Sequence, residues 1–296
     1  MSLWRTQGRP AGSFIRRAGS RGGRWALARY SLQGQYPGNP EIWHSLPGST
    51  DGLRERDEDI RSRPLFANHV GASTLIHVHT NAGDPLARGT RVFIQEGRIA
   101  DAQLGASILC YMREQIQSLP AYTAFPVQTA PQYDNYGENR LATMPSVIVE
   151  VGFHTNPTDA AALQNATFRS AAMRGVEKGY RLNSEGRTGC TPFAISSIPS
   201  SPGKYYQDFP VKYYFTGYPR FPVTLKTTNV SCPSGWTCSN KSTSYARVVP
   251  SPLTSNFYCT AQSTTPAATF KWRTTLVDAD GVATKPVDHT TTCSPR

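Results

Sequence analysis

The stretch Leu75–Ala82, which reads L-I-H-V-H-T-N-A, is the most informative part of this chain for predicting its first domain. Side chains alternate between the two faces of a strand, so Ile76 and Val78 would share one face. His77 and His79 would share the other. The pattern therefore predicts a short strand that presents two imidazoles from one side of a sheet.

A second apolar run, Ser146–Phe153, reads S-V-I-V-E-V-G-F and carries a single carboxylate, Glu150. A continuous run of Val and Ile is typical of a buried parallel strand. An ionised carboxylate inside it would be costly unless it is paired or close to a metal. Two readings stay open for Glu150: a catalytic or metal-site carboxylate, or a buried ion pair with Arg91 or Arg140.

Helical patterns separate and follow these strands. Residues 99–118 place apolar side chains at a spacing of four, and Asn156-Pro157 supplies a helix start before a second such series. The two series are Leu104, Ile108, Met112, Ile116 and Phe168, Ala172, Val176, Tyr180. With a further strand at Thr90–Gln95, this order predicts an α/β domain with a largely parallel sheet and covering helices.

The segment before the histidine strand is rich in charge. We expect a helix over residues 60–68, with Pro64 in its first turn, where proline costs no hydrogen bond. We expect Glu55, Arg56 and Glu58 to lie on a solvated face, as charge runs usually do.

The composition changes near residue 186. Residues 186–204 are rich in Ser, Pro and Gly and predict a linker. Short β segments follow, and they predict an immunoglobulin-like sandwich. These segments are Val211–Thr216, Val223–Val230, Tyr245–Val249, Phe257–Ala261, Thr269–Val277 and, after the Asp280-Gly281 turn, Val282–Thr292. The predicted organisation is a basic, poorly ordered segment 1–40, an α/β domain 41–185, a linker 186–204 and a β-sandwich 205–296.

Four of the six cysteines lie in the last 65 residues, which favours disulfides formed outside a reducing compartment. We expect Cys232 to pair with Cys238 and Cys259 with Cys293, one of three pairings open to these four. Cys110 and Cys190 are expected to be buried thiols or a third bridge. The cysteines favour an extracytoplasmic location, although residues 1–40 show no apolar signal-peptide core.

The net charge of +11 is unevenly distributed. Residues 1–40 contain seven arginines and no Asp, Glu or Lys, which leaves only about +4 for the rest of the chain. Nucleic-acid binding by the body of the protein is therefore disfavoured, and a mildly basic surface suits an anionic cell wall. No apolar run is long enough to span a bilayer.

Several motifs occur together in order between about residues 50 and 182. They are Arg54, Asp57, Ile60, Arg63 with Ala67-Asn68; the strand I-H-V-H-T-N-A; Gly89-Thr90-Arg91-Val92-Phe93; and Met144 to Phe153 followed by Thr155-Asn156-Pro157. In combination they resemble the zinc-dependent N-acetylmuramoyl-L-alanine amidases of bacterial cell-wall turnover.

The resemblance implies a Zn²⁺ enzyme that cleaves the amide between N-acetylmuramic acid and L-alanine in peptidoglycan. His79 matches the second histidine ligand of zinc in that family. Glu150 matches the catalytic glutamate that handles the proton. No position of the family assigns a ligand role to His77.

The sequence departs from the family upstream of Arg54. The family places its first zinc histidine and its glutamate ligand there, whereas only Glu41 and His44 are present, at a different spacing. Two alternatives stay open: an incomplete metal site, or an amidase domain whose amino-terminal part lies outside this chain. We therefore expect impaired catalysis, with a non-catalytic, amidase-like peptidoglycan-binding protein as the alternative function.

Overall fold

The computed structural model describes residues 2–4, 27–260 and 266–295, and these form two compact units. The first unit comprises the described residues of Met1–Arg113 and Ala124–Cys190. The second comprises those of Glu114–Thr123 and Thr191–Arg296. Among the described residues, no helix has the length and apolar character needed to cross a membrane.

The first unit is built on a five-stranded sheet in the order β1-β2-β5-β3-β4. The strands are β1 (Ser2–Trp4), β2 (Leu75–Asn81), β3 (Arg91–Ile94), β4 (Gln132–Tyr133) and β5 (Ser146–Phe153). The central pair β2–β5 is parallel, as predicted, and so is β3–β4. β1 runs antiparallel to β2, and β3 antiparallel to β5.

The α/β class is therefore confirmed, but the sheet is mixed rather than largely parallel. The connection from β2 to β3, residues 82–90, contains no helix. A parallel return usually needs a crossover of a dozen or more residues, so this short connection brings β3 back in the opposite direction.

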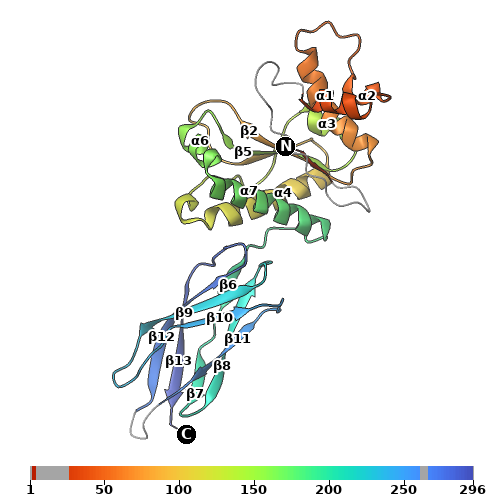
Figure 1. The fold of residues 1–296 in the computed structure, drawn as a ribbon. Coiled ribbons are helices and arrows are strands. Elements are labelled where there is room, and N and C mark those ends of the chain that lie inside the picture. The colour runs from red at the N-terminus through yellow and green to blue at the C-terminus, as the bar shows by residue number, and fades with distance from the viewer. Residues whose placement is uncertain (1, 5–26, 261–265, 296) are drawn as a thin grey trace. The chain divides into compact units, whose positions relative to one another are not determined.

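Two long helices, α4 (Ile99–Gln117) and α7 (Ala166–Ser184), lie together along one face of the sheet (Figure 1). The apolar series predicted for the first of them is fully buried at Leu104, Ile108 and Met112. Gly175 and Gly179 let α7 approach the α4 backbone, because a Cβ at either position would collide with Met112 or Ile108. A short helix, α6 (Pro157–Gln164), precedes α7, and Asn156 caps it as predicted by accepting from the N–H groups of residues 158 and 159.

A group of helices gathers on the other side of the sheet: α1 (Leu27–Gln35), α2 (Pro40–Trp43) and α3 (Arg54–His69) (Figure 1). α3 begins earlier than predicted, so Pro64 lies inside the helix rather than in its first turn. At that position the proline removes one backbone hydrogen bond of the helix. Of the segment 1–40 predicted to be poorly ordered, residues 1 and 5–26 lie outside the described residues, and residues 27–35 are helical.

The connection from α4 to β5 contains the 3-10 helix η1 (Pro120–Tyr122), strand β4 and the four-residue helix α5 (Gly137–Arg140). The sequence predicts a long functional loop here. α5 turns the chain toward β5, the strand that bears Glu150.

The second unit is a sandwich of two sheets, β10-β9-β12-β13-β7 and β11-β8-β6. Its strands are β6 (Ala194–Ser197), β7 (Ser201–Lys204), β8 (Asp208–Thr216), β9 (Val223–Ser231), β10 (Lys241–Tyr245), β11 (Leu253–Tyr258), β12 (Ala268–Val277) and β13 (Val287–Ser294). One core that includes Val211, Leu225 and Trp272 fills the space between the sheets. The predicted all-β sandwich is confirmed, while an immunoglobulin-like topology stays a prediction.

The boundaries within this unit differ from the sequence-based ones. β6 and β7 fall inside residues 186–204, where we expect a linker, and β7 pairs with β13 at the edge of a sheet. Ser and Pro signal a loop, but an edge strand tolerates both residues. The strand expected at 245–249 lies at Lys241–Tyr245, and the one expected at 257–261 begins at Leu253 and ends at Tyr258.

All six cysteines are paired. Cys232 bonds to Cys238 and Cys259 to Cys293, which confirms the predicted pairing. Cys110 on α4 bonds to Cys190. The third bridge, one of the two alternatives left open, is therefore present.

Candidate active site

Two histidines of β2 face the same side of the sheet, as the alternation in L-I-H-V-H predicts. His77 is fully buried, and the side chain of His79 is 31% exposed. The centroids of their rings lie 6.2 Å apart. The strand thus places one imidazole inside the protein and the next at the surface of the same site.

Glu138 on α5 lies against both histidines. Its Oε1 lies 3.3 Å from Nε2 of His79 and 3.6 Å from Nδ1 of His77. The ligand atoms of the three residues all lie within 4.8 Å of one another. The long connection before β5 therefore delivers a carboxylate to the histidine strand.

The local environment sets the charge state of this group. Burial lowers the pKa of His77 to about 3, so its imidazole is neutral at neutral pH. Burial alone would raise the pKa of Glu138. The hydrogen bond from His79 and the charges of the histidines and Arg63 outweigh it and lower that pKa to about 2. A neutral imidazole beside an ionised carboxylate is the protonation pattern that a divalent metal requires.

Glu150 is the cross-strand partner of His79 in the parallel β2–β5 pair. Burial raises the pKa of Glu150; His79 lowers it, and the carboxylate of Glu138 raises it further. The Oε2 atom of Glu150 is buried and has no hydrogen-bond partner among the described residues. A buried carboxyl with a raised pKa beside a group of candidate ligands marks Glu150 as a candidate functional residue.

The ion pair weighed for Glu150 does not form among the described residues. Arg91 lies over the ring of Phe153, with its Cζ 4.8 Å from the ring centroid. Arg140 donates instead to the backbone and side-chain oxygens of Asn135. The structural alternative for Glu150 is therefore wrong.

The donor set fits zinc. Two imidazole nitrogens and one carboxylate oxygen are ligand types that catalytic zinc uses. Ligand atoms that share a tetrahedral zinc lie about 3.3 Å apart, because each zinc–ligand distance is about 2.0–2.1 Å. The separations of 3.3 and 3.6 Å between Glu138 and the histidines agree with that spacing.

Glu41 and His44 are the two residues upstream of Arg54 that could have replaced the ligands of the family. Neither reaches this site. His44 contacts Glu58, with its Nδ1 3.1 Å from Oε1. Glu41 is exposed and accepts a hydrogen bond from Asn39. Glu41 lies in α2 and His44 directly follows it, and neither belongs to the group of His77, His79 and Glu138.

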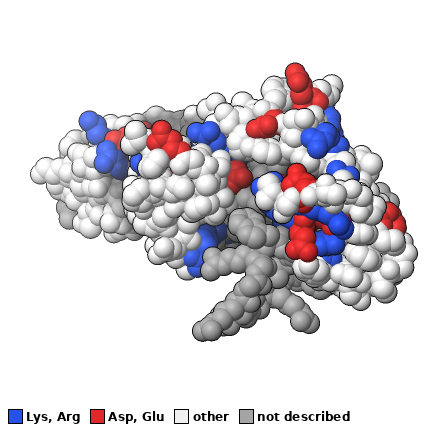
Figure 2. Space-filling view, turned by 90° about the horizontal axis from the view of Figure 1, so that it is seen from above, with Lys and Arg blue, Asp and Glu red and all other residues white. Residues whose placement is uncertain are grey.

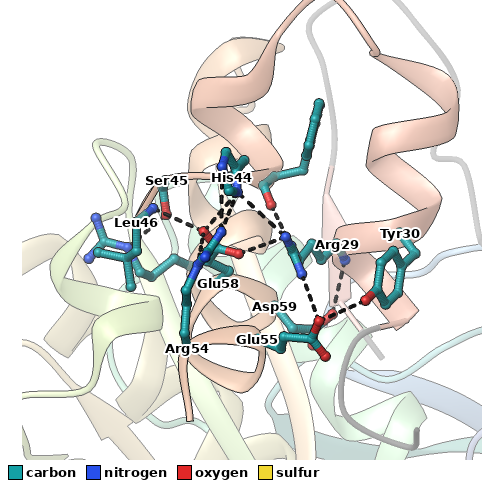
Figure 3. Close-up of polar contacts among 11 residues, drawn as sticks. Arg29, Tyr30, His44, Ser45, Leu46, Arg54, Glu55, Glu58 and Asp59 are labelled. Atoms are coloured by element: carbon teal, nitrogen blue, oxygen red, sulfur yellow. Dashed lines mark hydrogen bonds and ion pairs between the residues drawn. The ribbon is translucent and has the colours of Figure 1, made fainter. Parts of the chain in front are cut away.

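Glu58 itself corrects an expectation, because it is completely buried rather than solvated. Arg29, His44 and Arg54 surround its carboxylate (Figure 3). Arg29 Nη2 lies 2.9 Å from Oε2, and Arg54 Nε lies 3.4 Å from Oε1. α1 and α2 cover this side of α3, which the charge pattern of residues 51–59 does not reveal.

Other histidines and amides singled out in the sequence take structural positions. His154 is exposed and shares a hydrogen bond with Thr80, and His69 packs edge-on against Tyr36. The Asn81 side chain accepts from the N–H of Ala82.

Figure 2 shows acidic and basic side chains intermixed over the face it presents.

Sequence reasoning missed Glu138 and gave His77 no ligand role. Glu138 is separated from β2 by α4 and a proline-rich connection, so no short motif joins it to the histidines. A signal was present nonetheless: Glu138 is an acidic residue in the long loop that leads directly into the Glu150 strand.

Comparison with known proteins agrees with the resemblance seen in the motifs. Residues 49–180 match the family described as N-acetylmuramoyl-L-alanine amidase. This match agrees with the amidase resemblance that the sequence motifs predict for residues 50–182. No curated protein matches the chain.

Solved structures of amidases resemble part of the chain at low identity. The CwlD amidase from Clostridioides difficile, solved in complex with the GerS lipoprotein, is 17% identical; the match covers 46% of this chain and 67% of that one, with a TM-score of 0.41. The catalytic domain of CwlV from Bacillus (Paenibacillus) polymyxa var. colistinus is 18% identical, with coverages of 54% and 82% and a TM-score of 0.38. Ami1 from Mycobacterium smegmatis is 26% identical, with coverages of 41% and 59% and a TM-score of 0.32.

Proposed function

We propose that this chain is a zinc-dependent hydrolase that cleaves the amide between N-acetylmuramic acid and L-alanine in peptidoglycan. One observation carries the proposal: Glu138 joins His77 and His79 in a group of three ligand atoms within 4.8 Å, beside Glu150, whose Oε2 has no hydrogen-bond partner among the described residues. The match of residues 49–180 to the amidase family supports the substrate class.

We assign the ligand roles to His77, His79 and Glu138. The sequence gives only His79, and therefore suggests an incomplete site. His77 and Glu138 would supply the two ligands that the family takes from residues upstream. When bound, zinc supplies a Lewis acid that polarises the scissile carbonyl and acidifies a water molecule.

Glu150 then handles the proton. Its raised pKa lets the carboxylate accept a proton from the attacking water as the new C–O bond forms. The same carboxyl returns that proton to the nitrogen of L-alanine as the C–N bond breaks. The products are a free lactyl carboxylate on the sugar and a peptide with a free amino terminus.

The disulfides agree with the proposed setting. All six cysteines are paired, and such bridges persist outside reducing compartments. We propose an extracytoplasmic location with peptidoglycan as the partner.

A second candidate, a non-catalytic peptidoglycan-binding protein, is favoured by one contact. Arg63 Nη1 lies 2.6 Å from Oε1 of Glu138 and can neutralise that carboxylate without a metal. Zinc binding separates the two candidates, because only the hydrolase requires the metal.

The test combines a zinc titration with a peptidoglycan assay on the full chain. Zn²⁺ affinity is measured by competition with a chromophoric chelator, and hydrolysis by the appearance of new amino-terminal L-alanine. We expect one high-affinity zinc, lost in His79→Ala and strongly weakened in Glu138→Gln. His154→Ala, which removes an exposed histidine outside the group, should bind zinc normally.

Three other results would contradict the proposed zinc hydrolase. Binding to peptidoglycan without zinc or hydrolysis would establish the second candidate. Tight zinc that survives in His79→Ala and Glu138→Gln would show that the ligands are wrongly assigned. Zinc binding at this site without release of amino-terminal L-alanine would overturn the reaction.

A further inference from the structure

Arg63 bridges two carboxylates that lie on different elements. Its Nη1 lies 2.6 Å from Oε1 of Glu138 on α5, and its Nη2 lies 2.7 Å from Oδ2 of Asp59 one turn earlier on α3. Both carboxylates are largely buried, with side-chain exposures of 10% for Glu138 and 4% for Asp59. A guanidinium with two separate donor groups is suited to fix two such partners at once.

Asp59 is held in turn by the first turn of α1. Its Oδ1 accepts from the backbone N–H of Ala28 at 2.8 Å and of Arg29 at 2.9 Å. The two oxygens of Asp59 are therefore both engaged, one by a helix N-terminus and the other by Arg63. This carboxylate cannot turn away without losing buried hydrogen bonds, which fixes the guanidinium of Arg63.

The backbone around Glu138 is anchored separately from its carboxylate. The next residue, Asn139, donates to the carbonyl of Phe93 at 3.0 Å and accepts from the hydroxyl of Ser146 at 2.9 Å. These contacts hold the four-residue helix α5 against the sheet. The side chain of Glu138 can still rotate about three torsion angles, so the anchored backbone alone does not fix its carboxylate. Arg63 is a cationic group that contacts Oε1, the same oxygen that faces the two histidines.

We propose that Arg63 is a positioning residue that holds Oε1 of Glu138 toward His77 and His79 in a preformed zinc site, with Asp59 and the start of α1 as its anchor. The inference rests on the proposed function, because it concerns the ligands assigned there. It assigns to α1 a role in metal affinity, exerted through Asp59 and Arg63.

Substitution of Arg63 could change zinc affinity through charge or through the position of Glu138, and the two effects have opposite signs. Asp59, Arg63 and Glu138 together carry one net negative charge, so the site still attracts a cation. Replacing Arg63 by a neutral residue leaves two negative charges, which on charge alone would strengthen Zn²⁺ binding. A loss of affinity would therefore report the lost positioning of Glu138.

The experiment measures Zn²⁺ affinity of Arg63→Met in the full chain by chelator competition, after circular dichroism of the metal-free protein has verified the fold. We expect affinity to fall about 10–100-fold, the usual cost of losing a partner that orients a metal ligand. The matched control is Arg61→Met on the same helix. Arg61 donates to Ser45 Oγ at 2.9 Å rather than to Glu138 or Asp59, so the zinc affinity of this variant should change less than about 2-fold.

A double-substitution cycle tests whether Arg63 acts through Glu138. In a Glu138→Gln background, Arg63→Met should add less than about 3-fold, because the group that Arg63 positions has already changed. A full multiplicative loss in that background would overturn the proposal, as would unchanged or tighter zinc binding in Arg63→Met alone.

A second variant covers the case in which Arg63→Met does not fold. Asp59→Asn keeps an oxygen for the N–H groups of α1 and places an amide donor against Arg63, so zinc affinity should fall in the same direction. If His79→Ala and Glu138→Gln lose zinc while the Arg63 and Asp59 variants do not, only this inference fails. If the wild-type chain binds no zinc, this inference fails together with the proposed metal site.

Discussion

Glu150 and His79 lie directly beside each other, as partners across the parallel β2–β5 pair. The alternation of side chains along both strands points the carboxyl and the imidazole to the same side of the sheet. This places a proton-binding group next to a candidate metal ligand without any contribution from a loop.

We expect Glu150→Gln to reduce hydrolysis of peptidoglycan by about 10²–10⁴-fold, because glutamine keeps the volume and loses the base. Zinc content and unfolding midpoint should change little. The assay is the release of amino-terminal L-alanine. Glu185→Gln, which alters an exposed glutamate paired with Arg187, should retain full activity. Equal turnover of Glu150→Gln and wild type would exclude Glu150 as the base.

The contact between α4 and α7 predicts a sharp difference between two glycines. Gly175→Ala should lower the free energy of unfolding by about 2–3 kcal/mol, since its Cβ would overlap the backbone at Met112. Gly34→Ala, on α1 with nothing near its Cβ, should be neutral or stabilising by up to about 1 kcal/mol. Urea unfolding measures both. Equal effects would contradict the close helix packing.

His289 predicts a pH dependence of the sandwich. Its Nε2 lies 2.9 Å from Thr274 Oγ1, and burial lowers its pKa from 6.5 to about 4, against the opposing charge of Asp288. The unfolded chain binds this proton first, so the contribution of His289 to stability is complete above pH 6.5 and is lost as the pH falls to about 4. The loss amounts to at most about 3 kcal/mol.

The measurement is urea unfolding between pH 4 and pH 7, followed by tryptophan fluorescence, to which Trp272, the cross-strand partner of His289, contributes. His289→Gln should flatten the dependence over this window, while exposed His154→Gln should leave it intact. An unchanged slope in His289→Gln would assign the pH dependence to other groups.

The two disulfides of the sandwich should differ in their contribution to stability. Cys259–Cys293 closes a separation of 34 residues and Cys232–Cys238 one of 6. Replacing the first pair by Ala should cost roughly 3–4 kcal/mol and the second roughly 2 kcal/mol, by loop entropy. The first pair is also buried, which adds a cavity cost. Urea unfolding of both double variants measures which disulfide contributes more to the free energy of unfolding.

Local sequence patterns predict the elements whose periodicity is strong. The strands Leu75–Asn81 and Ser146–Phe153 and the helix over 99–117 occur where they are expected, because each buries an apolar face that the pattern makes visible. The sandwich and its disulfides were likewise predictable. His79 and Glu150 were identified from short motifs, and the structure brings them together.

The remainder depends on contacts between distant segments. Glu138 joins the histidines only because α5 brings its carboxylate to the side chains of β2, and Glu58 is buried only because α1 and α2 cover α3. β3 runs antiparallel because its connection is too short for a crossover. None of these relationships leaves a periodic trace in the sequence, so propensity and pattern alone could not predict them.

The bond between Cys110 and Cys190 spans 80 positions that include both Glu138 and Glu150. A single cut by a protease anywhere between these cysteines would leave two peptides that stay covalently joined under oxidising conditions. Denaturing electrophoresis of such a nicked protein would show one band without reductant and two bands with it. The carboxylates assigned to metal binding and proton transfer thus lie in a segment that one cleavage cannot release from the rest of its domain.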